Sequence, residues 1–220
     1  IWVRWGHSGQ YGTDFLVPGM AVEIVDNHTL EAYARRIVAK VERFNKEYSA
    51  VTFTEPLPEN IRPGHLIAAD EPGPDVHISG CRMSGNRARG LLIGSRGRVI
   101  IENNYFHIAG ASILFEGDGN FWFEQSGVRD VTIRNNIFAN GNYGSRGWGS
   151  ACIAVGSGIS QRQTSRYHRN IQVDGNLFRV FDPRIVNLYC VDGFQFSASN
   201  RIVRTSDYPA TFDPKLHFVF

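Results

Sequence analysis

The stretch VTIRNNIF, residues 131–138, contains two adjacent asparagines inside a strand-like pattern of apolar residues. Asparagine is normally disfavoured in strands, so the pair needs an explanation. The same pattern recurs as VIIENNYF at 99–106, as IQVDGNLF at 171–178 and, more weakly, as VHISGCRM at 76–83. A pattern that appears four times in one chain indicates an internal repeat, which determines the architecture.

The four copies share a frame of eight positions, in which positions one, three and eight are apolar. They start 23, 32 and 40 residues apart, which indicates a constant unit separated by loops of variable length. A second apolar segment follows each copy, at 90–94, 111–117, 151–156 and 184–191. Short strands of one unit cannot bury their own faces, so successive units must stack. The sequence therefore predicts a right-handed parallel β-helix.

The sixth position of the frame is expected at the same corner of successive coils. It holds Asn104, Asn136 and Asn176, whose amides can tolerate the bent backbone and bond to one another in a ladder. Cys81 takes this position in the first coil, and FQFSASNRI at 194–202 is predicted to be a degenerate fifth copy. The eighth position is expected to form an apolar column inside the helix, made of Met83, Phe106, Phe138 and Phe178.

The segment EPGPD at 71–75 divides the chain, because its prolines and glycine interrupt the pattern. Before it, short apolar runs such as AVEIV at 21–25 alternate with turn residues. We expect a small antiparallel β-barrel-like insertion in residues 1–70 and β-helix coils in residues 71–220. LEAYARRIVAKVERF at 30–44 is rich in helix formers, so a helix remains an alternative there. The predicted fold class is all-β, a right-handed parallel β-helix preceded by this insertion.

The composition excludes several classes of function. The chain has 23 basic and 21 acidic residues among 220, without a run of like charge, so nucleic acid is not an expected partner. No apolar run is long enough to span a membrane. The chain opens on Ile1 inside the strand-like IWVRW and closes on HFVF, so we expect a fragment of a longer protein.

The three cysteines, Cys81, Cys152 and Cys190, are widely separated and show no metal-ligand spacing. Buried thiols are expected, and a single disulfide in an oxidising compartment is the alternative. The sequence shows no motif for a metal or a cofactor, and it does not indicate the oligomeric state.

The strongest candidate site is the insertion FEGDGNFWFEQSGVRD, residues 115–130. It gathers Glu116, Asp118, Trp122 and Glu124 directly after a predicted core strand. Carboxylates can accept bonds from sugar hydroxyls or transfer protons, and an aromatic ring can cover the apolar face of a sugar. A solvated loop is the structural alternative. The spacing of Glu116, Asp118 and Asn120 also resembles the start of a calcium loop, whose later ligands are missing.

Other residues are weaker candidates. The arginines around GLLIG at 90–94 can bind carboxylates or vicinal hydroxyls, or they can be solvated ion pairs on the outer wall. The glycine-rich insertion at 140–150 offers possible contacts at the rim of a site. His107 and His168 show no partner in the sequence and are expected to be structural. The arginines are Arg87, Arg89, Arg96 and Arg98, and the rim residues are Tyr143, Arg146 and Trp148.

Three segments of the chain resemble a known family. NRARGLL at 86–92, ILFEGD at 113–118 and WFEQ at 122–125 are similar to segments of glycoside hydrolase family 110, the exo-acting α-1,3-galactosidases. The likeness is strongest over residues 74–145, continues loosely to about residue 205, and fits residues 1–70 as a β insertion. It implies a right-handed β-helix with small β-barrel additions, a glycan with terminal galactose as substrate, and a secreted or periplasmic location.

One departure from the family bears on catalysis. The resemblance implies catalytic aspartates in an Asp-Asp stretch upstream of the barrel insertion, and no adjacent aspartates occur in this chain. The catalytic acids are therefore expected outside it. A polysaccharide lyase, using an arginine as base, and a non-catalytic carbohydrate-binding or adhesin module remain alternatives. The substrate-facing residues expected here are Arg89, Glu116, Asp118, Trp122 and Glu124.

Overall fold

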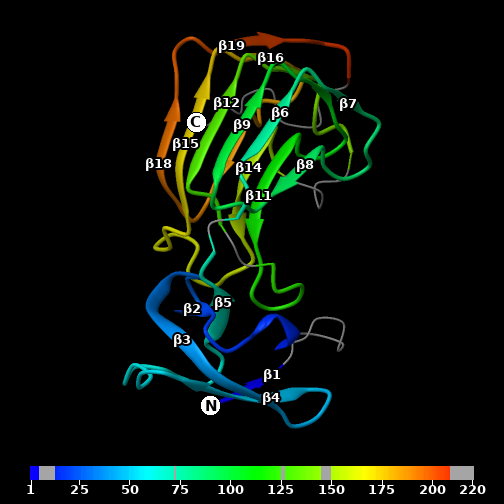
Figure 1. Ribbon diagram of the computed structural model, residues 1–220. Coiled ribbons are helices and arrows are strands. Elements are labelled where there is room, and N and C mark those ends of the chain that lie inside the picture. The colour runs from blue at the N-terminus through cyan, green and yellow to red at the C-terminus, as the bar shows by residue number, and fades with distance from the viewer. Residues whose placement is uncertain (5–12, 72, 125–126, 145–149, 209–220) are drawn as a thin grey trace.

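The computed structural model describes residues 1–4, 13–71, 73–124, 127–144 and 150–208. Nearly all regular structure in these residues is β-strand, and the one short 3₁₀ turn, η2, covers Thr13–Phe15. An antiparallel sheet lies at one end of the molecule and a stack of parallel coils forms the rest (Figure 1). The predicted all-β class is therefore confirmed.

The antiparallel part is a five-stranded sheet in the order β1-β4-β3-β2-β5. The long strand β3 pairs with β2 on one side and β4 on the other, so the segment that allowed a helix is a strand. Both neighbours use its backbone hydrogen-bonding groups, which outweighs its local helix propensity. The strands are β1 (Trp2–Arg4), β2 (Ala21–Val25), β3 (Ala32–Arg43), β4 (Tyr48–Phe53) and β5 (Leu66–Ala69).

The parallel part contains three sheets, in the orders β18-β15-β12-β9-β6, β19-β16-β13-β10-β7 and β17-β14-β11-β8. Each strand pairs with the strand three places away in the chain, so each of the first four coils contributes one strand to each sheet, and the fifth contributes β18 and β19. This is the predicted parallel β-helix. Its strands are β6 (Val76–Ser79), β7 (Arg82–Ser84), β8 (Leu91–Ile93), β9 (Arg98–Glu102), β10 (Tyr105–His107), β11 (Ile113–Gly117), β12 (Asp130–Arg134), β13 (Ile137–Ala139), β14 (Ile153–Ser157), β15 (His168–Asp174), β16 (Leu177–Val180), β17 (Val186–Leu188), β18 (Val191–Phe196) and β19 (Arg201–Arg204).

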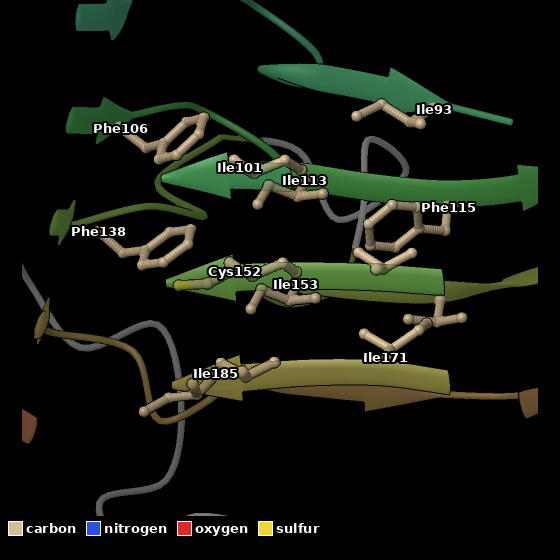
Figure 2. Packing of buried hydrophobic residues seen from close by; sticks show 14 of the residues in the cluster. Ile93, Ile101, Phe106, Ile113, Phe115, Phe138, Cys152, Ile153, Ile171 and Ile185 are labelled. Carbon is tan, nitrogen blue, oxygen red and sulfur yellow. The ribbon is translucent and has the colours of Figure 1, made fainter. Parts of the chain in front are cut away.

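The predicted frame is in register. Val131 lies opposite Val99 on one side and Ile171 on the other, and Val76 lies opposite Val99. The apolar column is also confirmed: the rings of Phe106 and Phe138 stack with centroids 5.1 Å apart, and those of Phe138 and Phe178 with centroids 4.7 Å apart. Figure 2 shows the first of these pairs inside the core, beside isoleucines from the other two sheets.

The corner of each coil uses its two polar residues differently, which corrects one expectation. The fifth position, not the sixth, takes the left-handed backbone conformation, with φ of 56° at Asn103 and 55° at Asn135. Glycine fills this position in the other two copies, at Gly80 and Gly175. Asparagine and glycine are the residues that adopt this conformation most readily. The first asparagine of each pair therefore makes the bend and the second is free to build the ladder.

The ladder itself is confirmed. Asn136 Nδ2 donates to Oδ1 of Asn176 at 3.0 Å and to the carbonyl of Ile101 at 2.9 Å. Its own Oδ1 accepts from the backbone nitrogen and from Nδ2 of Asn104, both at 3.0 Å. The ladder also extends through Asn200, whose Oδ1 accepts from Asn176 Nδ2 at 3.0 Å. The segment 194–202 is thus the predicted fifth copy, with its own ladder residue.

The thiols only partly follow the sequence expectation. All three are free, and Cys152 and Cys190 are buried. Cys81 is exposed, contrary to the prediction, although its backbone nitrogen does bond to Oδ1 of Asn104 at 2.9 Å as the first member of the ladder. It lies in the first of the parallel coils, where the stack covers the corner from one side only.

The two parts of the chain share a small core. Val25 and Ala68 of the antiparallel sheet, and Leu30 of the turn between β2 and β3, are buried in one cluster with Ile159, Tyr167 and Cys190 of the β-helix part. Polar contacts add to it: the hydroxyl of Ser165 donates to the carbonyl of Thr29 at 2.7 Å. This shared core fixes the sheet against the coils. The division into domains 1–70 and 71–220 stays a prediction.

Candidate functional site

Glu116 lies on the outer face of the β-helix, near the end of β11. Ile113 and Phe115 of the same strand are fully buried, so strand alternation turns Glu116 outward, where it is exposed. Its partner across the sheet is Gly156 of β14. Glycine adds no side chain there, and the nearest side chain is that of Tyr189, whose Cβ would lie 3.7 Å from a Cβ at Gly156.

Four charged side chains surround Glu116 closely enough to affect its ionisation. Partial burial raises the pKa of its carboxyl above the ordinary value, and the neighbouring carboxylates of Asp118 and Glu124 raise it further. The cations of Arg89 and Arg162 act in the opposite direction. The structure therefore brings together four of the five predicted residues. It adds Arg162, for which the sequence pattern contains no signal.

Arg162 enters the site from the loop that follows β14. Its guanidinium carbon lies 5.7 Å from the ring centroid of Tyr189, which follows β17. Arg89 enters from the turn before β8, where the side chain of Asn86 donates to its carbonyl at 3.1 Å. The two cations thus come from different coils of the stack, and both lower the pKa of the Glu116 carboxyl.

Asp118 has a structural task that the sequence did not reveal. Its carboxylate accepts the backbone nitrogens of Asn120 at 2.8 Å and Phe121 at 3.0 Å, and also that of Trp122. A carboxylate that binds the backbone of its own turn fixes the turn's shape. The described residues contain no group of three or more His, Cys, Asp or Glu side chains placed to hold a metal ion. A direct contact from Asp118 to substrate stays a prediction.

The turn presents aromatic side chains to solvent. Trp122 is 52% exposed, and the neighbouring Phe121 and Phe123 are also exposed. The ring of Phe121 meets the edge of Trp122 with centroids 4.7 Å apart. Three adjacent exposed aromatics are unusual unless they contact a partner or ligand. The loop therefore offers the aromatic plate that the sequence predicted.

The base of this loop is held against the antiparallel sheet. A Cβ added to Gly119 would lie 2.4 Å from Cδ1 of Leu66 and 2.9 Å from Cδ2 of Leu30, so a larger residue requires these leucine side chains to move. On the other side, Nδ2 of Asn120 donates to the carbonyl of Gly158 at 3.2 Å. The antiparallel sheet is thus a brace for the loop that carries Trp122.

Gly119→Ala should lower the free energy of unfolding by about 1–3 kcal/mol, because the new methyl group overpacks this contact. Combined with Leu66→Ala, which removes the obstructing methyls, the loss should be smaller than the sum of the two single effects. Urea denaturation of the four proteins in the double-mutant cycle measures this coupling. Gly158→Ala is the matched control, because nothing lies within 4 Å of a Cβ there. Strict additivity of Gly119→Ala and Leu66→Ala would contradict the brace.

His168 supports the floor of the site from inside. It is fully buried, and Nε2 lies 2.9 Å from the carbonyl oxygen of Gly156, the residue beside Glu116. Nδ1 accepts from the backbone nitrogen of Val128 at 3.3 Å. These partners require a neutral ring with its proton on Nε2. Burial lowers the pKa of His168 to about 4, and the predicted structural role is consistent with this.

This burial predicts a pH dependence of stability. Because the folded-state pKa of His168 lies below the ordinary value of 6.5, the unfolded chain binds the proton first as the pH falls. The free energy of unfolding should therefore decrease from about pH 6.5 toward pH 4. His168→Gln should flatten the decrease between pH 6.5 and 5 in denaturation experiments at several pH values. An unchanged slope would show that other groups cause it.

The other arginines that the sequence suggested lie in different surroundings. Arg96 is buried against Glu23 of β2, with nitrogen and oxygen 2.5 Å apart, and Arg98 faces Asp75 in an exposed pair at 3.8 Å. Arg87 is exposed. The structure thus separates the four arginines that the sequence grouped together.

Tyr143 of the glycine-rich insertion packs against His107 and not against Glu116. His107 has a structural place: Nδ1 lies 2.8 Å from the carbonyl oxygen of Ala139, and its ring stacks on Tyr143 with centroids 4.9 Å apart. Arg146 and Trp148 lie outside the described residues, as does Gln125 of the WFEQ motif.

Comparison with known proteins shows which proteins the chain is similar to. A family model described as GLAA-B β-barrel domain II matches residues 1–67. Over 204 residues, or 92% of this chain, the sequence is 38% identical to α-1,3-galactosidase A of Shewanella woodyi. The chain is related to the α-1,3-galactosidases of glycoside hydrolase family 110. The resemblance stated from the sequence motifs is thereby confirmed.

Two further galactosidases show how far this relationship extends. α-1,3-Galactosidase B of Bacteroides thetaiotaomicron is 35% identical over 90% of this chain, and α-1,3-galactosidase A of Bacteroides fragilis is 32% identical over 94%. The matched regions are 33%, 32% and 34% of the three galactosidases. The chain therefore spans about a third of the length of the curated relatives it matches.

Proposed function

We propose that this chain is the substrate-facing part of an exo-acting glycoside hydrolase that removes terminal α-1,3-linked galactose. The observation that carries the proposal is the arrangement at β11. An outward carboxylate, Glu116, lies among Arg89 and Arg162 beside an exposed tryptophan loop, in a chain related to α-1,3-galactosidases.

The arrangement suits the recognition of a galactose ring. The carboxylate of Glu116 can accept bonds from two hydroxyls, and charge-assisted bonds of this kind are stronger than neutral ones. The guanidinium groups of Arg89 and Arg162 can donate to the remaining sugar oxygens. Trp122 can cover the apolar face of the ring. We assign to Asp118 the role of shaping the loop, and to Glu124 that of a second acceptor.

We further propose that the acids that perform hydrolysis lie outside residues 1–220. Glycoside hydrolysis requires two carboxyl groups that flank the scissile bond, one of which gives a proton to the leaving oxygen. Here the carboxylate of Asp118, next to Glu116, already accepts hydrogen bonds from the backbone of its own loop. The proposed contribution of this chain is binding and orientation of the sugar.

This division of labour predicts that residues 1–220 alone do not hydrolyse nitrophenyl α-galactoside, whereas the full-length protein that contains them does. Positioning residues without the proton-transferring pair cannot supply the reaction. Release of nitrophenol from both purified proteins is the measurement. Robust turnover by residues 1–220 would place catalysis at Glu116, Asp118 or Glu124. An unsaturated product would indicate a lyase, and galactoside binding without turnover by the full-length protein would indicate a binding module.

The location follows from the proposed substrate. The described residues include no helix that is long and apolar enough to cross a membrane. Glycans with terminal galactose are found mainly outside the bacterial cytoplasm, so we propose a secreted or periplasmic protein. Appearance of the full-length protein in the periplasmic or culture fraction of its host tests this.

A further inference from the structure

A cavity lies between the antiparallel sheet and the β-helix. Its volume is about 830 Å³, within the range of 300–1,000 Å³ that is usual for small-molecule sites. Neither Glu116 nor Arg89, Arg162 or Trp122 lines it. One wall comes from the segment around β2 and β3, and the other comes from the turns that precede β9, β12 and β15.

The β-helix wall of the cavity is a row of arginines from successive coils. Arg96 precedes β9, Arg129 precedes β12 and Arg169 lies at the start of β15, and these strands are neighbours in one sheet. The charges are close enough to repel one another: burial lowers the pKa of Arg129, and Arg96 and Arg169 lower it further. Like charges held together in this way favour a bound anion.

The carboxylates in the cavity do not balance this charge. Glu23 is shared between Arg96 at 2.5 Å and Arg129 at 3.7 Å. Asp26 accepts from the backbone nitrogens of His28 and Thr29. The lining contains five arginines, Arg62, Arg96, Arg129, Arg166 and Arg169, against three carboxylates, Glu23, Asp26 and Glu31. The formal excess is two positive charges.

The cavity is also equipped for hydroxyl groups. Tyr33 and Tyr167 line it, and the hydroxyl of Tyr33 lies 2.7 Å from Nδ1 of His65. Asn60 adds an amide. Aromatic rings and neutral hydrogen-bonding groups beside arginine forks match a ligand that combines a ring, hydroxyls and an oxyanion.

We propose that this cavity binds an acidic saccharide, a sugar that carries a sulfate or a carboxylate group. The anionic substituent lies against Arg129 and Arg169, and the sugar ring lies toward Tyr33. The site is distinct from the one at Glu116, and its existence does not depend on the galactosidase proposal. It gives the antiparallel sheet a binding role, because that sheet forms one wall.

Isothermal titration of residues 1–220 tests the proposal with four probes: galactose 6-sulfate, galacturonic acid, galactose and inorganic sulfate. At least one of the two acidic sugars should bind more tightly than inorganic sulfate, and its affinity should fall as salt is raised. Galactose reports the separate site at Glu116. The comparison between the two acidic sugars distinguishes sulfate from carboxylate as the recognised group. Failure of both acidic sugars to bind, or binding of inorganic sulfate as tight as that of the better acidic sugar, would overturn the proposal.

Substitutions of the cavity arginines test whether the acidic sugar binds in this cavity. Arg129→Gln and Arg169→Gln should each weaken binding of the acidic sugar about ten- to a hundredfold, the loss expected for one charge-assisted contact. Arg204→Gln, an exposed arginine in β19, is the matched control and should bind normally. Thermal unfolding checks that each variant is folded; if Arg129→Gln is not, because of its contact with Glu23, Arg169→Gln carries the test. Normal binding by the folded arginine variants would also overturn the proposal.

Discussion

Asn136→Ala should lower the free energy of unfolding by about 3–4 kcal/mol, because it removes the centre of the corner ladder. The side chain donates to Asn176 and Ile101 and accepts two bonds from Asn104, and all of this is buried. Each buried polar group left without a partner costs about 1–3 kcal/mol, and alanine leaves such groups both above and below. Urea denaturation monitored by far-ultraviolet circular dichroism gives the value.

Asn120→Ala is the comparison for this prediction. Asn120 is exposed, and its side chain donates one bond, to Gly158. Its removal should cost about 1 kcal/mol or less, because solvent can replace the lost partner. Equal losses for Asn136→Ala and Asn120→Ala would mean that the ladder does not stabilise the stack.

The stacking could be predicted because it leaves a periodic trace in the sequence. Phe106, Phe138 and Phe178 recur at one position of the frame, and a residue that must stack on its equivalent has to recur. The sequence did not reveal which asparagine of each pair makes the bend and which joins the ladder, because asparagine suits both positions. Only the backbone angles show that Asn135 makes the bend and Asn136 the ladder.

The site was predictable only in part. Alternation along β11 places Glu116 outward once Phe115 is known to be inside, and this follows from local sequence. Arg162 belongs to a loop of the next coil, so its approach to Glu116 depends on packing between coils. The contact of Gly119 with Leu66 and the arginine cavity depend on how the antiparallel sheet docks on the β-helix, and no periodic pattern encodes that docking.

Glu116→Gln in the full-length protein should reduce kcat/KM on α-galactosides about ten- to a hundredfold. The glutamine keeps the shape of the side chain but loses the charge that strengthens bonds to two sugar hydroxyls, and each tenfold loss corresponds to about 1.4 kcal/mol. The same substitution should increase the stability of the folded protein. A carboxyl whose folded-state pKa is raised destabilises the fold at neutral pH, so the melting temperature of Glu116→Gln should not fall and is expected to rise.

Glu102→Gln is the control for the effect of replacing a glutamate with glutamine outside the proposed sugar site. Glu102 lies on the outer wall in β9, where it pairs with Arg134 at 2.6 Å and with His77 at 2.9 Å. The bonds from Arg134 and His77 lower the pKa of its carboxyl, the opposite of the effect at Glu116. The same substitution at Glu102 therefore removes a surface ion pair and leaves the proposed sugar site intact.

The ratio of kcat/KM for these two variants is the most direct test of the claim that β11 carries the galactose site. Both are measured in the full-length protein on an α-1,3-linked galactobioside, with circular dichroism showing that each is folded. We predict that Glu116→Gln loses about ten- to a hundredfold in kcat/KM. Glu102→Gln should stay within about twofold of the unmodified protein, because its partners Arg134 and His77 lie outside the proposed sugar site and the loss of such a pair affects mainly stability. Unchanged kinetics for both variants, or a loss confined to Glu102→Gln, would contradict the site.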